Sequence, residues 1–196
     1  MPDATPGRPR DPNLDERAIA ATLELLLEVG FDGTTIQAVA KRSGVHASAI
    51  YRRWSSRIDL IETAIAPRFD ELDVEPTGNL RADLLRYVSA YLEILGAPAA
   101  HAAAPGLLSH YRSNGDHRTP DQYLPISARP QFVRILAAAP PGSIDPAIDL
   151  DDAFDLLLSS LLARTLIPTI AARDRPIAIT VDLLLRMLRE QPQPTS

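Results

Sequence analysis

Positively charged side chains gather in one short stretch of the chain, from Thr34 to Arg57, which contains no Asp or Glu. Clustered lysine and arginine side chains are the groups that bind nucleic-acid phosphates. The whole chain is nevertheless acidic, with 20 Lys and Arg against 25 Asp and Glu and a formal net charge of -5. The stretch is therefore a local basic patch on an acidic protein, made of Lys41, Arg42, Arg52, Arg53 and Arg57.

Residues that would carry enzyme or metal chemistry are scarce. The chain contains no cysteine, which excludes disulfides, thiolate zinc sites, iron–sulfur clusters and cysteine nucleophiles. The four histidines have no H-x-x-x-H spacing, and the sequence has no G-x-S-x-G elbow, evident carboxylate pair or glycine-rich phosphate loop. We therefore expect no catalytic residues, no metal and no cofactor.

The composition, with 45% hydrophobic and 23% charged residues, is typical of a globular protein. The first ten residues lack the apolar stretch of a signal peptide. The richest apolar segment, residues 154–172, is interrupted by Asp155, Arg164 and Pro168, so it falls short of a membrane helix. These features, together with the absence of cysteine, predict a cytoplasmic protein with no membrane partner.

The elements that position the basic patch are predicted to be helices. No proline occurs between residues 13 and 66, as expected of a compact helical unit. Asn13 and Thr34 are the expected N-caps, since a Glu or Gln follows each of them three residues later. Glycines and prolines then place the helices at residues 13–30, 34–43, 45–54 and 57–69, the last bent or ended by Pro67.

Two of these helices have the features of a helix-turn-helix. Ala40 is small enough for the helices to approach each other, and Gly44 can adopt the left-handed conformation that the turn requires. Val39, Val45 and Ile50 have the spacing that fills the wedge between the helices. Taken alone, the same wedge also fits an ordinary helical hairpin.

The remainder of the chain is predicted to be helical as well. We find no alternating apolar run that would make a strand, so the expected fold is all-α. Pro105 and Gly106 predict a kink or a late start in one helix, and residues 112–125 should form a loop. The expected helices lie at residues 79–96, 99–112, 131–139, 150–167 and 177–190.

The stretch Gly33-Thr-Thr-Ile-Gln-Ala-Val-Ala-Lys-Arg-Ser-Gly-Val-His-Ala-Ser-Ala-Ile-Tyr-Arg-Arg-Trp54 closely resembles the TetR/AcrR family of transcriptional regulators. The preceding Glu28-Val-Gly-Phe31 and the following Ser-Arg-Ile-Asp-Leu-Ile61 share this resemblance. It implies an N-terminal helix-turn-helix DNA-binding domain plus a C-terminal helical ligand-binding and dimerisation domain. The implied parts are a flexible basic arm (1–12), the DNA-binding domain (13–71, motif about 34–54), the regulatory domain (72–190) and a disordered tail (191–196).

The resemblance implies roles for individual side chains on DNA. The residues nearest the base edges in the major groove would be His46, Ala47, Ser48 and Ala49. Phosphate contacts would come from Thr35, Lys41, Tyr51 and Arg57. Arg52 and Arg53 would contact phosphate or guanine, or one of them would merely be solvated, and Trp54 would lie in the core. In the arm, Arg8 and Arg10 would enter the minor groove, unless the arm is a disordered tail.

This chain departs from the commoner family pattern at three of these positions. His46 stands where a Ser is frequent, Ala47 where a Lys is frequent, and Ala49 where a Thr is frequent. Short apolar side chains donate no hydrogen bonds to bases, so thymine-methyl contacts and the neighbouring His46 and Ser48 would matter more.

The resemblance further implies that the last two helices form a dimer interface with their copies, unless the domain's own core absorbs their apolar side chains. The residues expected there are Phe154, Leu157, Leu158, Leu161, Val181, Leu184, Leu185 and Leu188. The middle helices would enclose a small apolar effector, and the residues expected at the wall of that pocket are Tyr87, Tyr91, His101, Leu108, His110, Tyr111 and Phe132.

The predicted function is a ligand-responsive, dimeric repressor that binds a palindromic double-stranded DNA operator and is released by its effector. A constitutive DNA-binding protein without a ligand is the alternative. A helical enzyme is a further alternative that the sequence does not favour.

Overall fold

The computed structural model describes residues 12–70, 72–114, 127–169 and 175–189. Within these ranges the secondary structure is helical and contains no strand, which confirms the predicted all-α class. The chain separates into two compact units, residues 1–64 and 65–196, rather than at the boundary expected after residue 71. Helix α5 (Pro67–Asp70) explains the difference, because its Phe69 packs edge-on against Tyr91 of the second unit with ring centroids 6.3 Å apart.

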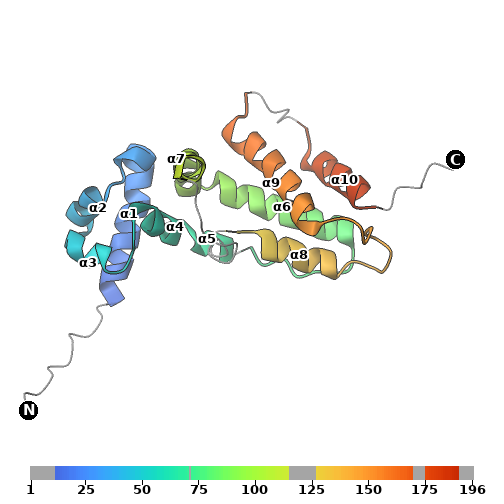
Figure 1. Ribbon diagram of the computed structural model, residues 1–196, viewed down its shortest axis with the longest axis horizontal. Coiled ribbons are helices and arrows are strands. Elements are labelled where there is room, and N and C mark those ends of the chain that lie inside the picture. The colour runs from blue at the N-terminus through green and yellow to red at the C-terminus, as the bar shows by residue number, and fades with distance from the viewer. Residues whose placement is uncertain (1–11, 71, 115–126, 170–174, 190–196) are drawn as a thin grey trace, which may run out of the picture. The chain divides into compact units, whose positions relative to one another are not determined.

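Four helices make up the first unit (Figure 1): α1 (Pro12–Gly33), α2 (Ile36–Ser43), α3 (Ala47–Tyr51) and α4 (Arg57–Ile65). The break predicted at Gly30 is present. This glycine has a non-helical φ of 69°, so α1 is kinked there. The turn at Gly44 is also confirmed, with φ 69° and ψ 13°. These left-handed values suit glycine, which has no Cβ to clash with the backbone.

The predicted start of the second helix is wrong by one residue. Thr35, and not Thr34, is the N-cap of α2, and its hydroxyl oxygen accepts a hydrogen bond of 3.1 Å from the backbone N–H of Ala38. The Thr34 hydroxyl instead donates to the carbonyl of Gly30 at 2.7 Å. Thr34 therefore closes the turn after α1. Helix α1 itself begins at Pro12, so Asn13 is a helical residue and not the cap.

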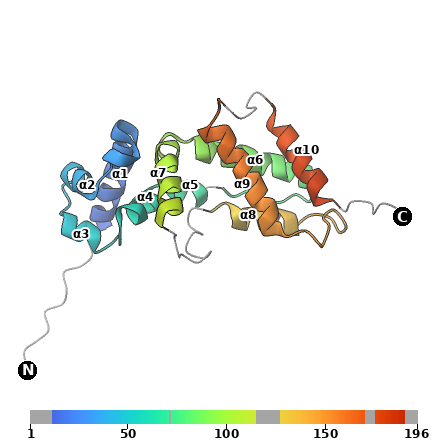
Figure 2. The same ribbon diagram turned by 45° about the horizontal axis from the view of Figure 1, so that its top comes forward.

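The second unit is built around α6 (Leu80–Gly96), which packs against α8 (Arg129–Ala137), α9 (Leu150–Leu166) and α10 (Ile177–Leu188). Both views show α9 and α10 running beside α6 (Figure 1, Figure 2). Asn79 caps α6 as predicted, with its side chain accepting from the N–H of Ala82 at 3.1 Å. Helix α7 (Pro98–Asn114) continues through Pro105, so the late start expected there does not occur.

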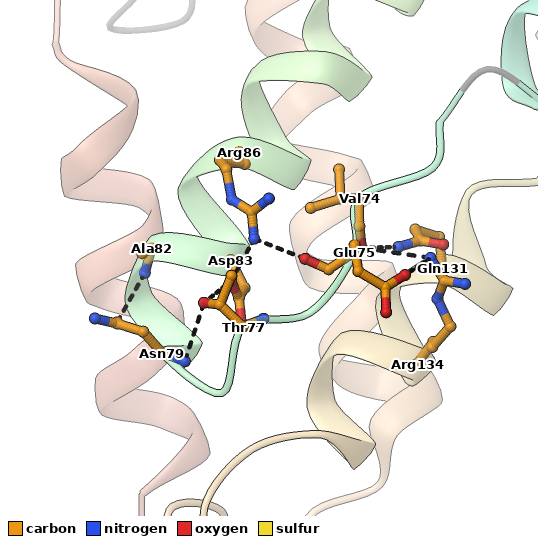
Figure 3. Close-up of polar contacts among 9 residues, drawn as sticks. All are labelled: Val74, Glu75, Thr77, Asn79, Ala82, Asp83, Arg86, Gln131 and Arg134. Carbon is orange, nitrogen blue, oxygen red and sulfur yellow. Dashed lines mark hydrogen bonds and ion pairs between the residues drawn. The ribbon is translucent and has the colours of Figure 1, made fainter.

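A buried carboxylate fixes the segment that leads into α6 (Figure 3). Asp83 is 1% exposed, and its two oxygens accept hydrogen bonds from the backbone N–H of Thr77 at 2.9 Å and from the Thr77 hydroxyl at 2.7 Å. Arg86 donates to the same carboxylate at 2.5 Å and to the carbonyl of Glu75 at 2.8 Å. Burial opposes ionisation, but the bonds from Thr77 and Arg86 outweigh it, so the pKa of Asp83 lies below its usual range.

Helix α8 holds the same segment from the other side. The amide of Gln131 donates to the carbonyl of Val74 at 2.6 Å, and the guanidinium of Arg134 pairs with Asp73. Figure 3 shows the side chains of Gln131 and Arg134 pointing toward Val74, in the segment before α6. Asp83 and Arg86 of α6 and Gln131 of α8 therefore all bind the backbone of residues 74–77, which links the two helices.

Replacing Asp83 by Asn should lower the free energy of unfolding by about 1–3 kcal/mol at pH 7, because one acceptor is lost and an NH2 group faces the Thr77 donors. A carboxylate with a depressed folded-state pKa stabilises the protein above its unfolded pKa of about 3.9, and this stability is lost as pH falls through the folded pKa. Urea denaturation of the wild type and of Asp83→Asn should therefore differ at pH 7 and converge in strong acid.

The matched control is Glu93→Gln, which removes an exposed carboxylate from the same helix. It should leave the urea midpoint unchanged. Equal midpoints for Asp83→Asn and the wild type at pH 7 would contradict the role assigned to Asp83.

Candidate nucleic-acid interface

An apolar wedge holds the turn between α2 and α3. Val39, Val45 and Ile50 are all buried, as the sequence predicts, and Trp54 joins them in the core. Ala18, Ala21 and Leu25 of α1 complete this cluster. A five-residue helix is too short to be stable alone, so α3 owes its place to these contacts.

The face of α3 that points away from the wedge carries polar side chains. His46, Ser48, Tyr51 and Arg52 are exposed, and none of them bonds through its side chain to another residue that the structure describes. His46 occupies the N-cap position without a side-chain cap bond, so its imidazole is available for contacts outside the chain. Lys41, near the end of α2, is exposed as well.

Ala49, which the sequence places among the residues nearest the bases, faces inward in this structure. It is only 7% exposed and belongs to the apolar cluster beneath α3. The reason is helical spacing: Ala49 and Ile50 share the inward face of α3, whereas Ser48 lies on the outward face. Ala47 is half-buried and packs partly against the same cluster.

Three arginines of the basic patch, Arg42, Arg53 and Arg57, bind other groups within the protein. Arg42 donates to Glu24 at 3.1 Å and to both oxygens of Glu28 at 2.9 and 2.5 Å. The hydrogen bonds that Arg42 donates to Glu28 and Glu24 raise the pKa of Arg42, and the one to Glu28 lowers the pKa of Glu28. Arg53 forms an ion pair with Asp15 in the first turn of α1.

Arg57 fastens the start of α4 to the end of α1. Its guanidinium donates to the carbonyl of Phe31 at 3.2 Å and to that of Asp32 at 3.4 Å. It also lies 4.3 Å from the centroid of the Phe31 ring, a cation–π arrangement. Thr35 is similarly engaged, as the cap of α2. Arg8 and Arg10 of the predicted arm lie outside the described residues.

The side chains expected to line an effector pocket do not form one wall. Tyr87, Tyr91 and Phe132 are buried in the core of the second unit, where they form one cluster with Phe154 in which contacting rings have centroids 5.6–6.5 Å apart. The Tyr87 hydroxyl donates to the carbonyl of Ala128 at 2.9 Å. Burial raises the pKa of both Tyr87 and Tyr91, which therefore remain neutral.

The other four expected pocket residues belong to α7. His101 and Leu108 are exposed, while His110 and Tyr111 are half-buried with their rings 6.1 Å apart. A hollow of about 630 Å³ lies elsewhere, between the start of α6, the turn after α8 and the end of α10. None of the seven expected residues lines that hollow.

Most of the expected dimer residues contribute to the core of the single chain. Seven of the eight are at most 7% exposed, and Leu158 is half-buried against the same cluster. They lie on α9 and α10, which pack against α6. The seven are Phe154, Leu157, Leu161, Val181, Leu184, Leu185 and Leu188.

A different apolar row remains exposed on the last two helices. Leu156 of α9 is 59% exposed and Leu183 of α10 is 57% exposed, and Ile167 directly after α9 and Ile179 of α10 are exposed as well. We call these four residues the outer apolar row. Sequence reasoning missed it because each helix carries two leucine-containing faces, and the more continuous one is the core face.

Two further searches of the described ranges concern metal-binding clusters and membrane-spanning helices. In residues 12–70, 72–114, 127–169 and 175–189, no three His, Asp or Glu side chains gather in a way that could hold a metal ion. None of the helices found in these ranges is long and apolar enough to cross a membrane.

Comparison with known proteins connects both units to one family. Residues 18–64 match the profile described as "Bacterial regulatory proteins, tetR family", and residues 74–184 match "Tetracyclin repressor-like, C-terminal domain". The uncharacterized HTH-type transcriptional regulator Rv1556 of Mycobacterium tuberculosis is 31% identical over 190 residues, which cover 95% of this chain and 91% of that protein. YdeS of Bacillus subtilis, another regulator of this type, is 25% identical over 82% of each chain.

Solved structures share the fold. BioQ bound to its double-stranded DNA operator superposes with a TM-score of 0.63 at 17% identity, over 89% of this chain and 96% of that one. The multidrug binding protein EbrR with ethidium superposes with a TM-score of 0.60 at 17% identity, over 91% and 99%. The two matched domains, the relative at 31% identity and the helix-turn-helix described above agree: this chain belongs to the TetR family, as a DNA-binding transcriptional regulator and not an enzyme.

Proposed function

We propose that the protein is a ligand-responsive repressor that binds a palindromic operator as a dimer and leaves it when a small apolar effector binds. The observation that carries the DNA side of this proposal is the outward face of α3. It presents Ser48, Tyr51 and Arg52 with no bond to another described side chain, while the inward face is held in an apolar core. Such a face suits insertion into the major groove.

In this proposal the exposed residues divide their work on DNA. Lys41, Tyr51 and Arg52 contact backbone phosphates, and His46 and Ser48 reach base edges. The arm residues Arg8 and Arg10 enter the minor groove. Phosphate contacts position the protein on any sequence, whereas base contacts select one.

The dimer in this proposal forms through the outer apolar row. Leucine side chains more than half exposed on adjacent helices are costly in water and gain stability when a second copy covers them. A two-fold axis would bring the same row from each copy together. The symmetric pair would then match the symmetry of a palindromic operator.

The effector in this proposal is small, mostly apolar and either uncharged or aromatic. The core of the second unit contains four buried Phe and Tyr rings, and Arg129, 4.5 Å from the centroid of the Phe154 ring, is paired with Asp151 and Asp155. Such a core suits apolar compounds better than charged ones. EbrR with ethidium and TetR with minocycline have the same fold at 17–18% identity, which supports an aromatic effector class.

Close packing of Tyr87, Tyr91 and Phe132 favours a second candidate, a DNA-binding protein that acts without a ligand. Thermal-shift screening with aromatic compounds, ethidium among them, separates the two candidates. The leading proposal expects a compound that raises the melting temperature and weakens operator binding. Compounds that stabilise the protein yet leave operator affinity unchanged would favour the second candidate.

Replacing Arg52 by Ala should weaken binding to all DNA sequences alike and make it less dependent on salt. Each phosphate contact contributes about 0.9 to the slope of log affinity against log salt, so losing one per subunit of a dimer should reduce the slope by about 1.8. The measurement is a salt series on a duplex selected from a random library. Arg112→Ala, an exposed arginine of α7, is the control and should leave the slope unchanged.

Replacing Ser48 by Ala should change which bases are preferred more than it changes overall affinity. A base contact typically discriminates by about 1–3 kcal/mol, which corresponds to roughly a 5- to 150-fold preference at one base pair. Repeating the random-library selection with the variant would reveal the change at two symmetric positions. Selection of the wild-type sequence by Ser48→Ala would rule out a base contact from this residue.

Introducing charge into the outer apolar row should separate the dimer. The wild type should have twice the 21.3 kDa mass of one chain by light scattering, and Leu156→Glu or Leu183→Glu should have the mass of one chain. Leu108→Glu places the same charge at an exposed leucine of α7 and should remain dimeric. A wild-type mass of 21.3 kDa at micromolar concentration would refute the proposed dimer.

A further inference from the structure

We infer that Arg53 and Arg42 are positioning residues, which hold α3 and α2 on α1 through ion pairs, and that they do not bind DNA phosphates. The inference rests on the proposed operator binding and deepens it. It divides the basic patch into two parts with different tasks. Lys41 and Arg52 are exposed with no side-chain partner among the described residues, whereas Arg42 and Arg53 are bound to carboxylates of α1.

Helical spacing places Arg53 and Arg52 on different faces. Arg52 has φ -74° and ψ -19°, so helical geometry continues past the last residue of α3. Arg53 then follows the buried Ala49 by four positions, and Arg52 follows the exposed Ser48 by four positions. Residues four apart share a face of a helix, so Arg53 belongs to the inward face and Arg52 to the outward face.

Exposure and pairing agree with this division. The Arg53 side chain is only 20% exposed and its guanidinium pairs with Asp15, near the start of α1. Moving this guanidinium to a phosphate would require breaking the pair and leaving the Asp15 carboxylate without it. The exposed Arg52 can reach a phosphate without breaking any bond to a described side chain.

Arg42 is held in the same manner farther along α1. Its two terminal nitrogens bond to both oxygens of Glu28, at 2.9 and 2.5 Å, and one of them also bonds to Glu24 at 3.1 Å. Glu24 and Glu28 are four residues apart and therefore face the same way. A forked guanidinium bound to two carboxylates has a defined orientation, which a single ammonium group would not provide.

The ion pairs orient the helices, which the apolar contacts between these helices do not. Apolar contacts such as those of Ile50 and Trp54 hold α3 against α1 but are non-directional. Charge-assisted hydrogen bonds depend on angle, so those from Arg42 to Glu24 and Glu28 fix the rotation of α2, and the Arg53–Asp15 ion pair holds the end of α3 near the start of α1. Exposed ion pairs contribute little to unfolding free energy, so their loss should affect DNA binding more than stability.

Neutralising the carboxylate partners separates positioning from phosphate binding. If Arg53 only positions α3, Asp15→Asn should weaken operator binding at least threefold without changing the salt slope, although it removes a negative charge. If Arg53 binds a phosphate, Asp15→Asn removes a carboxylate that competes with the phosphate, and affinity should stay equal or rise. The same reasoning applies to Arg42, which is tested with the double variant that combines Glu24→Gln and Glu28→Gln.

Glu16→Gln is the matched control for these measurements. Glu16 is exposed, lies next to Asp15 in α1, and has no side-chain bond to another described residue. Its neutralisation changes net charge as Asp15→Asn does and should not weaken binding. Circular dichroism and the thermal midpoint verify that each variant is folded before its DNA affinity is compared.

A charge swap provides the rescue test. Arg53→Asp should abolish operator binding, and Asp15→Arg combined with Arg53→Asp should restore most of it if the pair serves to position α3. A swap that remains as weak as Arg53→Asp, or an Asp15→Asn variant that binds as tightly as Glu16→Gln, would overturn the inference. Failure of the wild type to select any duplex would instead refute the proposed operator binding, so the two failures are distinguishable.

Discussion

The whole DNA-binding unit depends on one constraint: a five-residue helix must be held in a fixed orientation by contacts that it cannot supply itself. Nucleation of so short a helix is unfavourable in water. Gly44 supplies the left-handed turn that directs the chain into α3, and Val45 and Ile50 anchor it on α1 and α2. The positions of all outward-facing side chains of α3 depend on this anchoring. A side chain larger than hydrogen at position 44 would strain the turn, because φ 69° is unfavourable for it.

The second unit depends on the allocation of its apolar side chains between two faces of the same helices. On α9, Phe154, Leu157 and Leu161 point into the core, whereas Leu156 points out. On α10, Leu184 and Leu188 point inward and Leu183 outward. This division gives the single chain an apolar core that needs no partner. In the proposed dimer, folding and assembly would therefore be separate steps.

Much of this arrangement could be predicted from the sequence, because glycine, proline and apolar spacing act locally. Gly30, Gly44 and Asn79 mark helix ends correctly since their effect depends on the backbone beside them. The choice between Thr34 and Thr35 could not be predicted, because both have the chemistry of a cap and only the path of the chain after Gly30 decides.

The tasks of individual residues were harder to predict for a related reason. Arg52 and Arg53 are identical in type and adjacent, and their difference arises from Asp15, which is nearly forty positions away in sequence but in contact after folding. Ala49 and the core leucines of α9 and α10 show the same limit, because spacing identifies a face but not what covers it. Glu24 and Glu28, four apart on α1, were the one sequence signal that could have suggested a partner for Arg42.

Carboxylates on α1 also bear on how such a protein finds its site among the many competing sequences of a chromosome. Asp15, Glu24 and Glu28 neutralise two of the five cations of the basic patch, so the surface offered to an arbitrary duplex is less positive than the sequence suggests. Attraction to arbitrary DNA is almost entirely electrostatic, whereas recognition of one sequence also uses groove contacts. Pairing these arginines with carboxylates therefore lowers binding to arbitrary DNA more than binding to the correct site. The ratio of these two affinities is what selectivity in a genome requires.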